Sequence, residues 1–174
     1  YFTVANPVAR FATALLYDLR GHGRSARPSD GYRVDDMVAD LEGLLDAEDI
    51  DSPVYIVGNS FGGLLAVAFA MAHPERTAGL ILVDAHWSDA GWSDEMIRTL
   101  GLKGEARNQK IMESFQSWLG RHSERKRNRL ARNAEALVHQ TTLLRDLEGS
   151  PAIDRDQLGA LACPVLALYG ERSD

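Results

Sequence analysis

The sequence has a single cysteine, Cys163, so the chain of 174 residues cannot close a disulfide within itself. Cys163 precedes an apolar run, and we interpret it as a small buried core residue rather than a reactive thiol. No apolar run approaches the roughly 18–20 residues that a membrane-spanning helix needs. Net positive charge is lacking too, because 19 Lys and Arg stand against 25 Asp and Glu, a net charge of −6. We therefore expect neither nucleic acid nor a membrane as a partner.

Metal-ligand spacing is also absent among the five histidines and the lone cysteine, so we predict no metal and no other cofactor. The 45% hydrophobic and 25% charged content is typical of a globular protein that we expect in the cytoplasm. The sequence begins at Tyr1 rather than at a methionine, and neither end looks natural. We expect the natural chain to be longer at both ends, and a removed signal peptide stays an open alternative.

Short apolar runs predict four strands, each bounded by glycine, proline or charged residues. Two helices are predicted between them: an amphipathic one over residues 34–48 and one over 61–73 that is apolar on every side. Continuous apolar strands separated by helices indicate an α/β fold, with a mostly parallel sheet that helices cover on both faces. The predicted strands are residues 12–18, 53–58, 80–85 and 164–170.

The strand and helix alternation stops after Ala85, and the next 75 residues or so favour helices only. We therefore divide the chain into an α/β core, residues 1–86 and 161–174, and an inserted helical cap, residues 87–160. The cap carries six Lys and Arg between Arg121 and Arg132. A solvated helix face explains this run better than a binding patch, although a basic patch would also attract an acidic substrate or an acyl-carrier partner.

The stretch Gly58-Asn59-Ser60-Phe61-Gly62 joins a predicted buried strand to a predicted buried helix. In this context Gly-x-Ser-x-Gly is a nucleophile elbow, in which a strained, left-handed serine lifts its hydroxyl above the end of the strand. We expect Gly58 and Gly62 to lack side chains because the chain folds back there, with Gly63 giving further clearance. Ser60 would be the nucleophile, and the backbone N–H of Phe61, at the start of the helix, a donor to an oxyanion.

These segments together resemble the α/β-hydrolase superfamily over nearly the whole chain. The resemblance is carried by "YDLRGHGRS" at residues 17–25, "VGNSFGG" at 57–63, "HPERTAGLILVDA" at 73–85 and "PVLALYGERSD" at 164–174. It implies a hydrolase core with a helical cap inserted after residue 86. It also implies that Asp174, past the last strand, is the acid of a catalytic triad, with Glu171 as a rival.

The triad histidine of this family follows the acid in chain order, so the resemblance implies a base beyond Asp174 and an N-terminal segment before Tyr1. His86 and Trp87, at the entrance to the predicted cap, are expected to line the pocket. His22 and His86 are weaker candidates for a replacement base. We expect His73 at the end of a helix, and His139 solvated on a cap helix.

The sequence therefore predicts a serine hydrolase that acts on an ester, lactone or thioester with an apolar part, through an acyl-enzyme. The predicted substrates include a coenzyme A or acyl-carrier thioester. Asn59 in "GNSFGG" resembles carbon–carbon bond hydrolases, so that reaction is an alternative on the same fold, as is acyl transfer or cyclisation. A binding module that kept the fold without catalysis is the alternative of another class.

Overall fold

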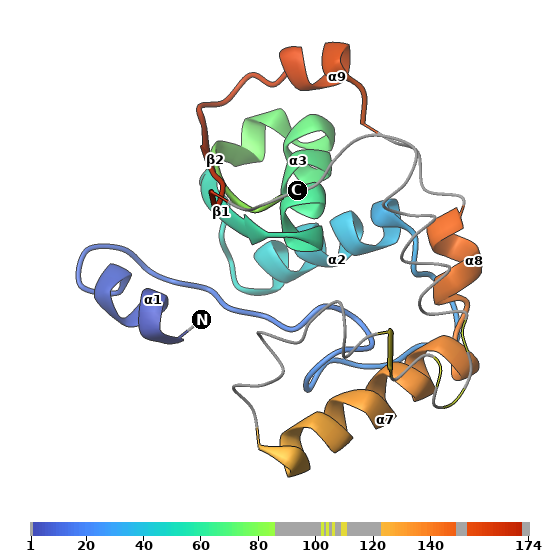
Figure 1. Cartoon of the computed structure of the whole chain (residues 1–174). Coiled ribbons are helices and arrows are strands. Elements are labelled where there is room, and N and C mark those ends of the chain that lie inside the picture. Colours follow the sequence, from blue (N-terminus) through green and yellow to red (C-terminus); the bar gives the residue numbers. More distant parts are fainter. Residues whose placement is uncertain are drawn as a thin grey trace.

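The computed structural model describes residues 2–85, 102, 104, 106, 109–110, 123–148 and 153–171. Two helices come first, strands and helices then alternate up to Val83, and helices follow up to the last strand (Figure 1). In chain order the elements are α1 (Phe2–Val8), α2 (Val34–Ala47), β1 (Val54–Asn59), α3 (Phe61–Ala72), the 3-10 helix η1 (Pro74–Arg76), β2 (Thr77–Val83), α7 (Glu124–Gln140), α8 (Leu143–Glu148), α9 (Arg155–Gly159) and β3 (Val165–Leu168).

The three strands form one parallel sheet in the order β1-β2-β3, which confirms the parallel arrangement that the sequence predicts. Val57 pairs with Ile81, and Ile81 pairs with Leu166, so the carboxyl ends of the strands meet at one edge. β1 is rich in β-branched and aromatic residues, which suit a pleated sheet, and it leads through one residue into α3. This β1–α3–β2 unit positions Ser60.

Residues 12–18 form no strand, and this prediction is wrong. Leu15 and Leu16 are 40% and 42% exposed, and none of the described residues pairs with this segment. An apolar run becomes a strand only when a neighbouring strand supplies the hydrogen bonds of a ladder, and the described part of the chain offers none here.

Helices cover one face of the sheet in the described residues. α3 packs against β1 and β2, and α2 packs against α3 (Figure 1). On the opposite face Tyr55 is 72% exposed and Val57 is 60% exposed, so the predicted cover on both faces is found on one face only, among the residues that the structure describes. α3 itself is buried in its middle, where Val67 and Phe69 are fully inaccessible, but Met71 in its last turn is exposed.

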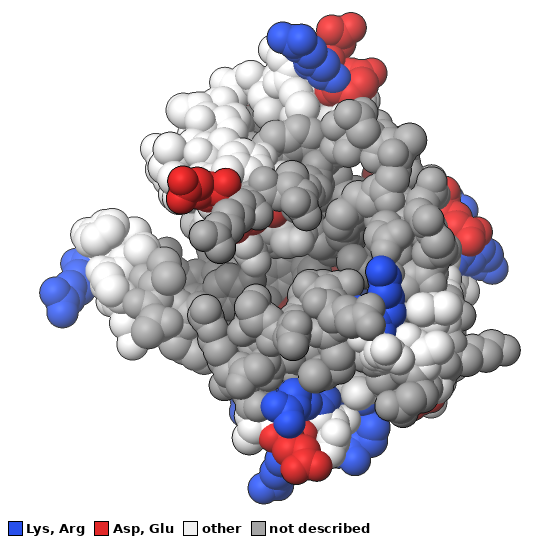
Figure 2. Space-filling model, in the orientation of Figure 1, with Lys and Arg blue, Asp and Glu red and all other residues white. Residues whose placement is uncertain are grey.

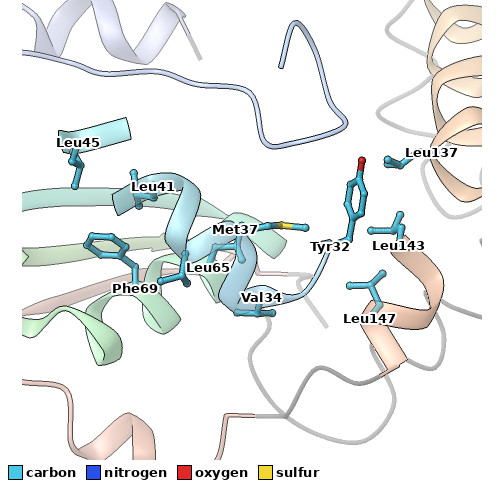
Figure 3. Packing of buried hydrophobic residues seen from close by; sticks show 11 residues of the cluster. Tyr32, Val34, Met37, Leu41, Leu45, Leu65, Phe69, Leu137, Leu143 and Leu147 are labelled. Atoms are coloured by element: carbon cyan, nitrogen blue, oxygen red, sulfur yellow. The ribbon is translucent and has the colours of Figure 1, made fainter. Parts of the chain in front are cut away.

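A hydrophobic cluster joins α2 and α3 to helices of the predicted cap (Figure 3). Tyr32 is fully buried, and its hydroxyl donates to the carbonyl oxygen of Pro28 at 2.9 Å. Leu137 from α7, and Leu143 and Leu147 from α8, belong to the same cluster. Each buried leucine contributes about 1.5–3 kcal/mol of transfer free energy, so α7 and α8 are held firmly on this side of the molecule.

Asp146 adds a polar link within that cluster. Its side chain is 4% exposed, and its carboxylate accepts a hydrogen bond from the Tyr32 backbone N–H at 2.9 Å and another from the Thr142 hydroxyl. Burial, the largest single influence, raises the pKa of Asp146, but hydrogen bonds from Thr142, Tyr32 and Arg145 outweigh it and leave the pKa below the ordinary value. The carboxylate is therefore charged at neutral pH.

The structure confirms the helix predicted over residues 34–48 and places helical segments within the predicted cap, while residues 86–101 and 111–122 lie outside the described part. Cys163 is a free thiol and half-buried rather than fully buried. No described helix combines the length and the apolar character that crossing a bilayer requires.

Candidate active site

Ser60 lies in the sharp bend between β1 and α3, with φ 52° and ψ −122°. Among the described residues only Asp49, Ser60 and Asp84 combine a side chain with a positive φ. This is the strained backbone that the sequence predicts, and such a conformation costs of order 1–3 kcal/mol unless the surroundings impose it. Ser60 is half-buried, at the carboxyl end of its strand.

Hydrogen bonds from both flanking elements hold the bend. The Ser60 N–H donates to the carbonyl oxygen of Val83 at 3.0 Å, and the Asn59 Nδ2 donates to the same oxygen at 2.9 Å. The Gly63 N–H donates to the Ser60 carbonyl oxygen at 2.8 Å. The bend is therefore bonded to β2 on one side and to the first turn of α3 on the other.

Two glycines make the bend possible, and they are Gly58 and Gly63. A Cβ atom on Gly58 would stand 2.3 Å from the carbonyl oxygen of Gly62 and 2.6 Å from the Gly63 Cα. A Cβ atom on Gly63 would collide with Ala85. At Gly62 the same atom would meet nothing within 4 Å, so the clash predicted at Gly62 is wrong. The close approach falls one residue later because α3 begins at Phe61 and turns Gly63 toward β2.

Asp84, which was not predicted as a site residue, links the ends of β2 and β3 at the carboxyl edge of the sheet. Its backbone N–H donates to the Leu168 carbonyl oxygen at 2.9 Å, and its Oδ1 accepts from the Gly170 N–H at 2.8 Å. Next to it, the Tyr169 hydroxyl donates to the Ala85 carbonyl oxygen at 3.0 Å. Burial first, and then the negative charge of Asp84, raise the pKa of Tyr169. The signal in the sequence that could have pointed to Asp84 is an acidic residue directly after the apolar run "LILV".

Of the other predicted site residues, Asp174, His86 and Trp87 lie outside the described part of the chain. Glu171, the rival acid, is exposed just after Gly170. Phe61 is the first residue of α3 and is half-buried. The structure thus brings the Ser60 bend and the end of β3, which leads toward Asp174, to one edge of the sheet.

No hydrogen bond joins the Ser60 Oγ to any histidine within the described residues. His22 is exposed, and its Nδ1 lies 3.0 Å from the Arg20 carbonyl oxygen. His73 caps the end of α3, as predicted, where its Nδ1 lies 3.3 Å from a Glu42 carboxylate oxygen and its ring lies tilted against that of Phe69. His139 is exposed on α7.

The described part of the basic run, residues 123–132, is largely exposed on α7 and carries five Lys and Arg against one Glu. Figure 2 shows Lys and Arg side chains together with acidic ones at the α7 end of the molecule, which agrees with a solvated helix face. Among the described residues, no three His, Cys, Asp or Glu side chains are grouped so that they could hold a metal ion.

The comparisons with known proteins agree with this geometry. The family model for the alpha/beta hydrolase fold matches residues 1–161. The chain therefore belongs to the α/β hydrolase fold family. Among curated proteins it is similar to the 2-hydroxy-6-oxo-2,4-heptadienoate hydrolase of Pseudomonas putida, with 36% identity over 115 residues that make up 65% of this chain and 41% of that protein.

Solved structures are similar as well. A hydrolase from Pseudomonas aeruginosa superposes with a TM-score of 0.67 over 97% of this chain and 66% of that chain, at 23% identity, a likeness that concerns the fold alone. The enol-lactonase from Burkholderia xenovorans has a TM-score of 0.60 and 25% identity over 89% of this chain and 61% of its own. The chain thus spans between about two fifths and two thirds of the length of these relatives.

Proposed function

We propose that this chain carries the nucleophile of a serine hydrolase, and that Ser60 attacks the acyl carbon of an ester, lactone or thioester. One observation carries the proposal: Ser60 has a positive φ in a bend closed by Gly58 and Gly63, after a parallel strand and before a helix. Such strain in a non-glycine residue is typical of functional sites, and this one matches the nucleophile elbow of the family.

In the proposed reaction a general base takes the proton of the Ser60 hydroxyl while the Oγ forms a bond to the acyl carbon. The carbonyl oxygen becomes an oxyanion, which accepts a hydrogen bond from the Phe61 backbone N–H at the start of α3. The tetrahedral intermediate expels the alcohol or thiol, which leaves with the proton from the base. Water then attacks the acyl-enzyme by the same route, releasing the acid and restoring Ser60.

The base is proposed to be a histidine from outside residues 1–174, oriented by Asp174. The proposal rests on the hydrogen bonds that join Leu168 and Gly170, at the end of β3, to Asp84. Asp84 directly follows Val83, which accepts the hydrogen bond of the Ser60 N–H. Among the described residues no histidine is hydrogen-bonded to the Ser60 Oγ, which agrees with this assignment. His86 and Trp87 follow β2 and are proposed to line the pocket rather than to react.

Two observations bear on the substrate. The enol-lactonase shares the fold at 25% identity, which favours an ester or lactone. The Pseudomonas putida relative is named for a compound without any ester or amide, so its hydrolysis must break a carbon–carbon bond. That relative, together with Asn59 before the serine, makes carbon–carbon bond hydrolysis the second candidate function.

Labelling with a fluorophosphonate tests the proposal, using the protein as the cell produces it and a Ser60→Ala variant as the control. We expect an adduct on Ser60 in the wild type and none in the variant. A wild-type protein that stays unlabelled would contradict the proposal and favour a binding module. p-Nitrophenyl butyrate and 2-hydroxy-6-oxo-2,4-heptadienoate, assayed side by side, separate the two reactions: a burst on the ester supports the first candidate, and turnover of the dienoate alone supports the second.

A further inference from the structure

Asp84 links the ends of β2 and β3 through two hydrogen bonds. The chain leaves β2 at Asp84 with φ 43°, a left-handed conformation that aspartate tolerates better than most residues. In this conformation the backbone N–H reaches the Leu168 carbonyl oxygen at 2.9 Å, and the carboxylate Oδ1 receives the Gly170 N–H at 2.8 Å. The carboxylate thus extends the contact between the strands two residues past the end of β3.

The same segment is bonded to the Ser60 bend. Val83, the residue before Asp84, accepts the hydrogen bonds of the Ser60 N–H and the Asn59 side chain. A continuous path therefore runs from Ser60 through Val83 and Asp84 to Gly170. Each of its bonds lies between 2.8 and 3.0 Å, and they join all three strands at the carboxyl edge of the sheet.

The side chain of Asp84 contributes something that a regular ladder cannot supply. β3 ends at Leu168, so the N–H of Gly170 is beyond the ladder between β2 and β3. The side chain of Asp84 supplies the acceptor oxygen that this N–H would otherwise lack in the ladder. Tyr169 lies between Leu168 and Gly170. Its hydroxyl donates to the carbonyl oxygen of Ala85, which holds Tyr169 against the residue that follows Asp84.

We propose that Asp84 is a positioning residue: its carboxylate holds the Tyr169–Gly170 turn at the edge of the sheet that also carries the Ser60 bend, and it acts on the proposed acid Asp174 through the chain that continues from this turn. The inference rests on the proposed serine hydrolase function. In this role Asp84 acts through the turn that it holds and not through a contact with the substrate. Its role needs a hydrogen-bond acceptor in the side chain, and the negative charge is secondary.

The test compares Asp84→Gly with Asp84→Asn on the ester or dienoate that the wild type turns over. Glycine adopts the positive φ without strain but lacks the acceptor, whereas asparagine keeps an acceptor oxygen. We expect Asp84→Gly to lower kcat by about 10- to 100-fold with KM within about threefold, because a misplaced group near the reacting atoms slows the chemical step. Asp84→Asn should stay within about threefold of the wild-type kcat.

Asp49→Gly is the matched control, because Asp49 also has a positive φ and is exposed two residues past the end of α2. It should leave kcat unchanged. A second measurement combines Asp84→Gly with Asp174→Asn. The added Asp84→Gly change should lower the kcat of Asp174→Asn by less than about threefold, since both changes act on the same group. Thermal melting checks folding, and Asp84→Asn, which keeps the acceptor oxygen, still tests the acceptor against the charge if the glycine variant does not fold.

The outcomes separate the two proposals. If the wild type is not labelled at Ser60 and is inactive, the hydrolase proposal fails and the role of Asp84 fails with it. If the wild type is active but Asp84→Gly keeps its kcat, only the role of Asp84 is overturned. A loss as large in Asp84→Asn as in Asp84→Gly would also overturn it, by showing that the charge and not the acceptor matters. Fully multiplicative losses in the double variant would contradict action through Asp174.

Discussion

Gly63 in α3 lies so close to Ala85, just past β2, that a Cβ atom on Gly63 would stand 2.3 Å from the Ala85 Cβ and 3.3 Å from the Ala85 Cα. Real side chains essentially never approach so closely. The contact brings the start of the helix directly against the end of the neighbouring strand. Together with the hydrogen bond from Ser60 to Val83, it fixes the place of the Ser60 bend relative to β2.

Replacing Gly63 by alanine should therefore destabilise the protein, whereas replacing Gly62 by alanine should not. We expect Gly63→Ala to lower the free energy of unfolding by about 1–3 kcal/mol, the usual cost of overpacking. Gly62→Ala meets open space in a helix, so it should be neutral or stabilising by up to about 1 kcal/mol. Urea denaturation of the two variants measures the difference, and equal stabilities would contradict the packing described at Gly63.

Replacing Ser60 by glycine should relieve strain while removing the nucleophile. The angles of φ 52° and ψ −122° are close to those of a type II′ turn, which favours glycine at this position. We expect Ser60→Gly to be about 1 kcal/mol more stable than Ser60→Ala, whose Cβ keeps the strain. Both variants should lose activity by about 10⁴-fold or more. Matched urea and kinetic measurements check this, and equal stability of the two variants would argue against a strained bend.

Asp146 should make the stability depend on pH in the acidic range. Its pKa in the folded protein is lowered, so its contribution is fully present above the ordinary carboxyl pKa of about 4 and is lost as the pH falls through the folded value. We expect the free energy of unfolding of the wild type to decline below about pH 4, with a smaller decline for Asp146→Asn. At pH 7 the variant should be about 1–3 kcal/mol less stable, because the one oxygen left to accept from Tyr32 and Thr142 is uncharged and an NH2 group replaces the oxygen that accepts from Arg145.

Asp156→Asn is the control for this experiment, because Asp156 is exposed on α9. Its urea midpoints between pH 3 and pH 7 should follow those of the wild type. A decline below pH 4 that is as steep in Asp146→Asn as in the wild type would assign the acid sensitivity to other carboxylates.

Leu147 should couple α8 to the core during unfolding. Leu147→Ala removes a buried side chain from the cluster that also contains Tyr32 and Leu143, and we expect a loss of about 2–5 kcal/mol. The unfolding transition should shift as a single step, with the same midpoint by far-ultraviolet circular dichroism and by tryptophan fluorescence. Two separate transitions would show instead that the predicted cap, residues 87–160, unfolds independently.

The strands and helices around Ser60 could be predicted from the sequence because their apolar runs follow one another along the chain and meet in space, with β1 paired to β2 and α3 packed against both. Residues 12–18 have the same apolar character, but strand formation depends on a neighbouring ladder that the run itself does not encode. The strained serine was predictable from the motif, whereas the collision at Gly63 depends on where Ala85 lies in space. Asp84 was overlooked because the sequence does not tell that its carboxylate meets Gly170.

Because β2 lies between β1 and β3, the proposed nucleophile and the proposed acid start from strands that are not neighbours. With adjacent strands about 4.8 Å apart, the two strand ends are separated by roughly 10 Å. A single imidazole ring, hydrogen-bonded at both of its nitrogens, is of the right size to bridge such a gap once the two side chains extend toward it. The middle strand, which supplies no reacting group in this scheme, therefore sets the length of the proton relay.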